Sequence, residues 1–295
     1  MKSKTVCVFV GLVIFGLSTI SVTAEEPQAI RVMSYNIRYN NPGDGINAWP
    51  NRKDHVAEMI GAKHRADFAG LQEVLKGQID DLAERLPNYA WIGVGRDDGW
   101  QKGEFSPIFY RKEQFELLQT NTFWLAETPE IPGSKSWDTS ITRVVTWGKF
   151  KDLKTDHEFY HFNTHFDHRG QKAREESAQL VWKKIKAIAG DAPTFFTGDF
   201  NTRENSKPYE ILAGKDSESD LIDARYVSKT VHRGPTASTS GAEGWTKIGP
   251  NESRIDYIFI RNGISVLSHQ ILDDQYDGRY PSDHLPVLAE IVIAD

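Results

Sequence analysis

Polar residues that could do chemistry stand at the ends of several short, mostly apolar runs of the sequence. In five places such a run ends in a carboxylate, an amide or an imidazole: Met33–Asn36, Gly70–Glu73, Asn163–His165, Thr197–Asn201 and Ser282–His284. In open α/β sheets, ligands bind outside one end of the strands, where side chains from several strands converge. We therefore expect these segments, together with Arg254–Tyr257, to build one site.

The residue types in this set suit a divalent metal and phosphate chemistry. Their oxygen donors are Asn36, Glu73, Asp199, Asn201 and Asp283. Carboxylate and amide oxygens without sulfur favour Mg²⁺ or Mn²⁺ over a structural zinc. A carboxylate can orient or deprotonate an attacking water, and an imidazolium can stabilise the charge that develops on phosphate oxygens. A histidine beside an aspartate would stay protonated near neutral pH.

The elements that must position these residues alternate between strand and helix patterns. Short runs rich in β-branched and aromatic residues predict strands at Ile30–Ile37, Phe68–Val74, Ala90–Val94, Pro107–Tyr110, Thr142–Phe150, Phe159–His165, Thr194–Phe200, Ile255–Ile260 and Leu285–Ile293. Helical spacing of apolar residues predicts helices over Arg52–Gly61, Lys76–Leu86 and Gly170–Ala189. The stretch Ser228–Ser253 predicts a long loop. No repeat or linker divides the sequence, so we expect one domain over residues 25–295.

The first 24 residues have the pattern of a secretory signal peptide. Lys2 and Lys4 precede an apolar run over Val6–Leu17, and small residues lead to a cleavage point before Glu25. The run is shorter than the ~20 apolar residues of a spanning helix. We therefore expect an exported protein, periplasmic, cell-surface or secreted, that has no membrane span after cleavage and is a monomer.

The predicted mature chain is acidic and lacks cysteine. It contains 33 basic and 41 acidic residues, a net charge of −8, and the one cysteine, Cys7, lies in the predicted leader. A protein that binds long nucleic acid mainly by neutralising phosphates needs a basic surface, so this charge balance disfavours tight non-specific DNA binding. Without cysteine, the mature chain has no disulfide, no thiol nucleophile and no thiolate metal ligand.

Six segments resemble, in order, the motif set of the endonuclease/exonuclease/phosphatase superfamily. They are Ser34–Arg38, Leu71–Val74, Asn163–His165, Gly198–Asn201, Arg254–Tyr257 and Ser282–Pro286. A single Ser-Asp-His would be weak evidence, whereas six motifs in the right order, over nearly the whole mature chain, are strong. The resemblance implies a secreted, bacterial-type member with a deoxyribonuclease I-like fold. That fold is a four-layered α/β sandwich, in which two mixed β-sheets pack face to face with helices outside.

The same resemblance implies a divalent metal, Mg²⁺ or Mn²⁺, at one end of the sandwich. The metal-binding glutamate of the superfamily corresponds to Glu73, with Asn36 and Asp283 at the same site. Apurinic-site endonucleases of the superfamily have an aspartate two residues after the first asparagine, where this chain has Arg38. That difference leaves both a one-metal and a two-metal site open.

The catalytic residues implied by the resemblance are an aspartate, an amide and two histidines. The water-activating aspartate corresponds to Asp199, and its partner amide, which touches the water or the phosphate, to Asn201. The imidazole that contacts a non-bridging phosphate oxygen corresponds to His284, oriented by Asp256. The second catalytic histidine of deoxyribonuclease-like members corresponds to His165. Together these residues imply hydrolysis of a phosphoester bond by an activated water.

The substrate is left open by the sequence. Arg143 resembles a superfamily arginine near the phosphate and would bind substrate together with Asn201, with a surface arginine at a strand edge as the alternative interpretation. Superfamily members hydrolyse small-molecule, lipid and nucleic-acid phosphoesters, so phosphatase, phosphodiesterase and nuclease activities all fit. The segments Ser106–Tyr110 and Phe123–Leu125 are closer to the phosphatase, deadenylase and sphingomyelinase members.

Two alternatives belong to other functional classes. Asn163–His168 resembles the His-x-His-x-Asp-His motif of metallo-β-lactamase-type zinc hydrolases, but Asn163 replaces the first histidine. Loss of one ligand weakens a dinuclear zinc site. A secreted sandwich domain can also be a catalytically silent binding module, because fold alone does not establish activity. Against this, the sequence retains all the predicted metal-binding and catalytic residues: Asn36, Glu73, His165, Asp199, Asn201, Asp256, Asp283 and His284.

Overall fold

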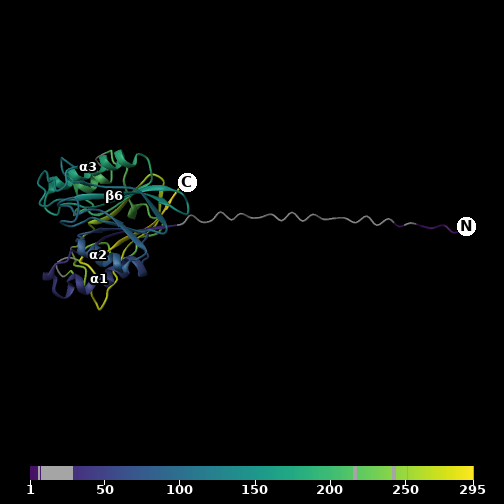
Figure 1. Ribbon diagram of the computed structural model, residues 1–295, viewed down its shortest axis with the longest axis horizontal. Helices are drawn as coiled ribbons and strands as arrows, with labels where there is room; N and C mark the ends of the chain where they lie inside the picture. The colour runs from purple at the N-terminus through teal and green to yellow at the C-terminus, as the bar shows by residue number, and fades with distance from the viewer. Residues whose placement is uncertain (6, 8–28, 215–217, 241–243, 251, 295) are drawn as a thin grey trace.

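The computed structural model describes residues 1–5, 7, 29–214, 218–240, 244–250 and 252–294, and its strands form two six-stranded β-sheets (Figure 1). The first sheet has the order β11-β12-β1-β2-β4-β3 and contains β1 (Ile30–Asn36), β2 (Phe68–Gln72), β3 (Tyr89–Ile92), β4 (Ile108–Arg111), β11 (Ile264–Ile271) and β12 (Val287–Ile293). The second has the order β5-β6-β7-β8-β10-β9 and contains β5 (Phe115–Trp124), β6 (Val144–Asp152), β7 (Glu158–His165), β8 (Thr194–Asp199), β9 (Ile222–Asp223) and β10 (Asp256–Arg261).

Helices cover the two outer faces of this pair of sheets. The helical elements are η1 (Pro42–Asn47), α1 (Trp49–Glu58), η2 (Met59–Lys63), α2 (Lys76–Arg85), α3 (Gln171–Ala189), α4 (Lys207–Leu212) and η3 (Ala224–Tyr226). In Figure 1, α1 and α2 lie on one side of the strands and α3 on the opposite side. Val56 of α1 and Met33 of β1 share one apolar cluster, whereas Val181 of α3 and Phe162 of β7 share another. The predicted four-layered sandwich is therefore confirmed.

Aromatic side chains fill the space between the two sheets. Phe68 of β2 is fully buried and contacts rings from four strands of the facing sheet. Its ring centroid lies 4.6, 4.9, 5.5 and 5.5 Å from those of Phe115, Phe150, Phe159 and Phe195, respectively. Three of these four contacts are edge-on, the geometry that ring quadrupoles favour. This packing holds the sheets in a fixed relation.

Strand register brings the motif residues to one end of the sandwich. The parallel pair β1 and β2 places Asn36 opposite Gln72, and the parallel pair β7 and β8 places His165 opposite Asp199. Antiparallel pairing of β8 with β10 places Asp256 opposite Asp199. Because each of these pairs is the last one at its end of the sheet, the two sheets present their polar residues at the same end.

The elements missed by the sequence patterns are amphipathic or short. β5 is a long edge strand whose exposed side includes Glu116, Gln119 and Asn121, so its composition resembles a loop. β11 alternates small polar and apolar residues, and α4 has only six residues. The predicted helices are confirmed, although α1 begins three residues earlier than expected and continues as the π-helical turn η2. The described parts of the predicted loop 228–253 contain no named helix or strand.

The predicted signal peptide lies outside the described residues except for positions 1–5 and 7, so it stays a prediction. Over the described ranges, no helix has the length and apolar character needed to cross a membrane.

Candidate active site

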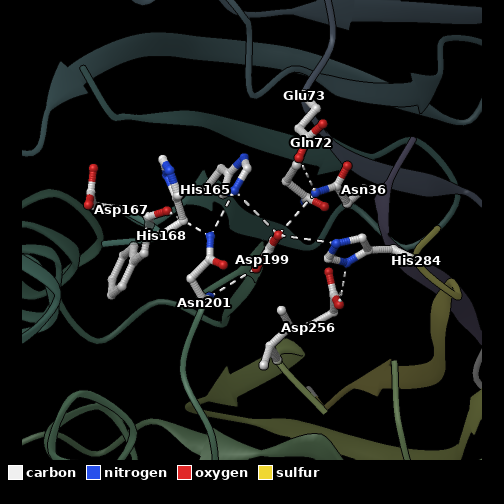
Figure 2. A network of polar contacts seen from close by, with 12 residues as sticks. Asn36, Gln72, Glu73, His165, Asp167, His168, Asp199, Asn201, Asp256 and His284 are labelled. Atoms are coloured by element: carbon white, nitrogen blue, oxygen red, sulfur yellow. Dashed lines mark hydrogen bonds and ion pairs between the residues drawn. The ribbon is translucent and has the colours of Figure 1, made fainter. Parts of the chain in front are cut away.

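The motif residues meet at one end of the sandwich, around the carboxylate of Asp199. Figure 2 shows Asp199 in the middle, with His165 and Asn201 on one side and His284 on the other. The contributing residues come from the ends of β1, β2, β7 and β8, from the first residue of β10 and from the loop before β12. The expectation that these segments build one site is therefore met by the geometry.

Asp199 is the most connected of these residues. It is the last residue of β8 and is 1% exposed. Three nitrogens approach its Oδ2 atom: Asn36 Nδ2 at 3.0 Å, His165 Nε2 at 3.3 Å and His284 Nε2 at 3.8 Å. Its Oδ1 atom accepts a hydrogen bond from the backbone N–H of Asn201. Burial, reinforced by the charge of Asp256, raises the pKa of Asp199. A carboxylate with a raised pKa is a better proton acceptor near neutral pH.

His284 and Asp256 form a hydrogen-bonded pair on one side of Asp199. His284 Nδ1 lies 2.9 Å from Asp256 Oδ2, and the same oxygen accepts a hydrogen bond of 2.6 Å from Ser238 Oγ. Burial disfavours the charge on His284, but the carboxylates of Asp256 and Asp199 outweigh it and raise the pKa of His284 well above its ordinary value. His284 is therefore an imidazolium near neutral pH, with Nε2 directed toward Asp199.

His165 on the other side of Asp199 has the opposite charge state. Its Nε2 lies 3.0 Å from Asn201 Nδ2, and its Nδ1 is buried without a hydrogen-bond partner among the described residues. Burial, with the charges of Arg143 and Arg96, lowers the pKa of His165 well below its ordinary value. The same residue type is thus neutral on one side of Asp199 and cationic on the other.

Glu73, which is partly exposed, and the fully buried Asn36 lie together beside Asp199. Glu73 Oε1 accepts a hydrogen bond of 3.1 Å from Asn36 Nδ2, and Oε2 accepts one of 3.2 Å from the backbone N–H of Tyr39. Glu73 has a φ of 60°, and Arg38 and Asn201 also have positive φ values, 57° and 47°. Left-handed backbone at non-glycine residues is uncommon and clusters at functional sites.

The oxygen donors near Glu73 fit a divalent cation. Asp283 Oδ2 lies 3.9 Å from Arg38 Nη1. The residue before Asp283, Ser282, donates its Oγ hydrogen to the carbonyl oxygen of Asn36. Partial burial and the charge of Glu73 raise the pKa of Asp283, although His284 and Arg38 oppose the shift. Carboxylates that disfavour each other's charge are the usual setting for a bound cation.

A second set of ligand atoms also lies close together. One ligand atom each of Asp199, Asp256 and His284 falls within 4.8 Å of the others. However, the Nδ1 atom of His284 and the Oδ2 atom of Asp256 are already hydrogen-bonded to each other. This set is therefore a hydrogen-bonded pair beside a carboxylate. Glu73 and Asp283 are partly exposed carboxylates of the site, whereas Asn36 is buried and its Oδ1 accepts a hydrogen bond from the backbone N–H of Arg38.

Arg143 is not a surface arginine. It is 4% exposed, Nη2 lies 3.2 Å from His168 Nδ1, and Nε and Nη1 have no hydrogen-bond partner among the described residues. It lines a small pocket with Arg96, Glu104 and His165. Burial lowers the pKa of Arg143 to about 10, so the guanidinium stays charged at neutral pH. The surface-arginine alternative for Arg143 is wrong, and the buried cation lies next to His165.

The zinc-type segment does not form a metal site. Asn163 points between the sheets, where Nδ2 donates to the carbonyl oxygens of Leu71 and Pro107 at 2.7 and 3.0 Å. Asp167 accepts hydrogen bonds from the backbone N–H groups of Ser140 and Gly170. These residues hold loops in place, as expected from the superfamily interpretation.

Several residues around the site were not singled out by sequence reasoning. Gln72 Nε2 donates to Asn163 Oδ1 at 2.8 Å and so ties the two sheets together directly beneath the site. Ser238 Oγ holds Asp256, and it comes from the predicted long loop. Gln72 lies within the Leu71–Val74 motif, whereas nothing in the sequence marks Ser238.

Comparison with known proteins agrees with this geometry. The model of the Endonuclease/Exonuclease/phosphatase family matches residues 33–284. A crystal structure of an endonuclease/exonuclease/phosphatase from Bacteroides vulgatus is 41% identical, covers 90% of this chain and 99% of its own, and has a TM-score of 0.85. A mannosyl-6-phosphatase of Bacteroides thetaiotaomicron is 38% identical over 90% of this chain and 100% of its own, with a TM-score of 0.84. An uncharacterised protein of Acanthamoeba polyphaga mimivirus is 25% identical over 88% of this chain and 98% of its own length.

Proposed function

The chain belongs to the endonuclease/exonuclease/phosphatase family, and from that premise we propose that it hydrolyses a phosphoester with a water activated by Asp199. The observation that carries the proposal is the arrangement around this carboxylate. Asp199 is buried, its pKa is raised, and it lies between a cationic and a neutral histidine. A silent binding module would have no need of two buried carboxylates, Asp199 and Asp256, this close together, since burial of charge costs free energy.

The roles of the other residues follow from their charge and position. His284, cationic and held by Asp256, can stabilise the negative charge that develops on a non-bridging phosphate oxygen. Asn201 donates its backbone N–H to Asp199, and its amide lies between His165 and the carbonyl oxygen of Phe166. This amide can orient the water or the phosphate. His165, as a neutral imidazole, can exchange a hydrogen bond without adding charge.

Glu73, with Asn36 and Asp283, would hold the divalent cation, Mg²⁺ or Mn²⁺. The fit rests on the hard oxygen donors of these residues and on the raised pKa of Asp283 beside Glu73. When bound, such a cation supplies positive charge that polarises the phosphate. Arg143 adds a second, permanent positive charge near His165.

Among phosphoesters, we favour a sugar phosphate monoester. The support is the similarity to the mannosyl-6-phosphatase, which extends over the full length of that chain at 38% identity. The net charge of −8 predicted for the mature chain also fits a small substrate better than long nucleic acid. A phosphodiesterase or nuclease is the alternative outcome of the substrate test below.

The first test removes the water-activating group. We expect Asp199→Ala to lower Mg²⁺-dependent hydrolysis of mannose 6-phosphate by about 1,000-fold or more, because general-base catalysis contributes roughly 10²–10⁴-fold. Glu113→Ala is the matched control, since this exposed carboxylate lies in the turn after β4, at the opposite end of the sandwich. Thermal unfolding of both variants checks that the fold is intact. Unchanged turnover in Asp199→Ala would refute the assignment.

The second test identifies the substrate and the metal. Wild type is assayed with Mg²⁺, Mn²⁺ or Zn²⁺ after metal removal, on mannose 6-phosphate, a generic phosphodiester, sphingomyelin, RNA and plasmid DNA. Preference for the sugar phosphate with Mg²⁺ or Mn²⁺ supports the proposal. Turnover of DNA or RNA alone would make the protein a nuclease, and activity with Zn²⁺ alone would contradict the proposed oxygen-ligand site.

We further propose that the protein is exported by its first 24 residues and acts as a monomer. The charge pattern before the apolar run supports export. Cell fractionation with mass spectrometry of the mature N-terminus tests the first point, and light scattering after size-exclusion chromatography tests the second. An intact Met1 on the cytoplasmic protein would contradict export.

A further inference from the structure

Arg52 of α1 makes an unusual set of contacts behind the proposed cation site. It is 4% exposed, although arginine is rarely buried to this extent without a paired charge. The five hydrogen bonds that its guanidinium donates within the described chain all end on backbone carbonyl oxygens. The acceptors are Asn47 at 2.8 Å, Arg38 at 2.7 Å, Pro281 at 3.2 Å, Tyr39 at 3.4 Å and Ile37.

Four of these five carbonyl groups, all except that of Asn47, belong to the two segments that carry Asn36 and Asp283. Residues 37–39 directly follow Asn36, and the backbone N–H of Tyr39 holds Glu73 Oε2 at 3.2 Å. Pro281 lies two residues before Asp283, and Ser282 Oγ donates to the carbonyl oxygen of Asn36 at 2.7 Å. A single guanidinium thus fixes the backbone behind Asn36, Glu73 and Asp283.

Helix stability does not explain the position of Arg52. It lies in the first turn of α1, where a positive charge opposes the helix dipole. No carboxylate of the described chain is among its hydrogen-bond acceptors. Instead, the guanidinium lies between two aromatic rings, 5.1 Å from Trp49 and 5.4 Å from Trp245. Cation–π contacts of this kind stabilise a buried guanidinium and restrict its movement.

We infer that Arg52 is a positioning residue that sets the affinity of the site for its divalent cation, an inference that rests on the proposed metal-dependent function. Groups behind metal ligands orient them, and their removal typically weakens metal binding by about 10–100-fold. Arg52 acts here through the backbone of two loops. None of its hydrogen bonds within the described chain ends on a side chain of the proposed cation site.

The experiment measures Mn²⁺ binding to metal-free protein by calorimetry, in wild type and in Arg52→Lys. Lysine keeps the charge but lacks the planar fork that reaches several carbonyl oxygens at once. We expect the dissociation constant for Mn²⁺ to rise about tenfold, and the turnover number to recover at saturating Mn²⁺. Arg52→Gln, which removes the charge, should raise the dissociation constant for Mn²⁺ further, toward about 100-fold.

Arg261→Lys is the matched control. Arg261 is also buried, at 2% exposed; it donates to the Gly190 carbonyl oxygen at 2.7 Å and pairs with Asp220, and its guanidinium lies 5.3 Å from the ring of Trp182. It belongs to the far end of β10 from Asp256, so its loss should lower stability without changing Mn²⁺ binding.

The outcomes separate this inference from the proposed function. An unchanged dissociation constant in folded Arg52→Lys, or an equal increase in Arg261→Lys, overturns the role of Arg52 alone. Absence of Mn²⁺ binding in wild type overturns the metal-dependent function, and this inference with it. A tenfold increase confined to Arg52→Lys, with turnover restored by excess Mn²⁺, supports both.

Discussion

The two sides of Asp199 show how one residue type acquires opposite charge states from its surroundings. His284 and His165 are both largely buried, and both direct Nε2 toward Asp199 Oδ2, at 3.8 and 3.3 Å. On the His284 side, Asp256 accepts a hydrogen bond from Nδ1. On the His165 side, Nδ1 has no partner among the described residues, and the charges of Arg143 and Arg96 add to burial in lowering the pKa. Because both rings are largely buried and both approach Asp199, the hydrogen bond to Asp256 is what distinguishes the cationic His284.

The two histidines can therefore contribute differently to the binding of a phosphate group. A cation at His284 can stabilise developing negative charge, whereas a neutral imidazole at His165 can only donate or accept a hydrogen bond. On the His165 side, positive charge comes from Arg143, which keeps its proton at all relevant pH values. The site therefore combines an imidazolium that depends on Asp256 with a guanidinium that does not.

The largest expected effect is the difference between replacing the two histidines. His284→Gln should lower the turnover number for the phosphoester by about 1,000-fold, because removal of a preorganised charged donor costs roughly 10²–10³-fold. His165→Gln should lower it by only about tenfold, the effect of one neutral hydrogen bond. Steady-state kinetics at saturating metal measure both. Equal losses would show that the two sides of Asp199 do not differ as proposed.

Removal of the partner carboxylate should have the next largest effect. Asp256→Asn preserves the shape of the side chain but not the negative charge that keeps His284 protonated. We expect the turnover number to fall by about 100-fold, since a hydrogen bond to a charged group contributes roughly 1.5–3 kcal/mol. Ser238→Ala is the control, because it removes only a neutral donor to the same oxygen. A loss in Ser238→Ala as large as that in Asp256→Asn would argue against a role for the charge.

Much of this site could be predicted because its residues stand at strand ends in a recognisable order. Asn36, Glu73, Asp199 and His284 each follow or precede an apolar run, and strand pairing then places them together. The sequence motifs contain the residue types but not their environment. The neutrality of His165 depends on Arg143 and on burial between sheets, which no local pattern reveals.

Other features were hidden for a different physical reason. Arg52 acts on backbone carbonyl groups, and every residue has one, so its partners leave no trace in the sequence. β5 was missed because an edge strand needs only one apolar face, and its polar residues gave it the composition of a loop. Ser238 was missed because its hydroxyl is one of many in a loop rich in small polar residues.

The smallest predicted effect tests whether burial keeps a histidine neutral away from the site, at His269 of β11. His269 is 1% exposed, its Nδ1 lies 2.9 Å from His232 Nδ1, and its Nε2 has no hydrogen-bond partner among the described residues. No salt bridge of the described chain pairs the His269 ring with a carboxylate, whereas His165 Nε2 lies 3.3 Å from Asp199 Oδ2. Burial, together with the charge of Arg254, lowers the pKa of His269 to about 2.

This lowered pKa makes stability depend on pH. Below its ordinary pKa of about 6.5, the unfolded chain protonates His269 while the folded chain does not, so the free energy of unfolding falls as pH decreases. From pH 6.5 to pH 5 the loss should be about 2 kcal/mol, and His269→Gln should remove that part of the slope in urea unfolding. If His269→Gln does not flatten the slope, burial is insufficient to keep a histidine neutral in this fold, and the main cause given for the neutral state of His165 is wrong.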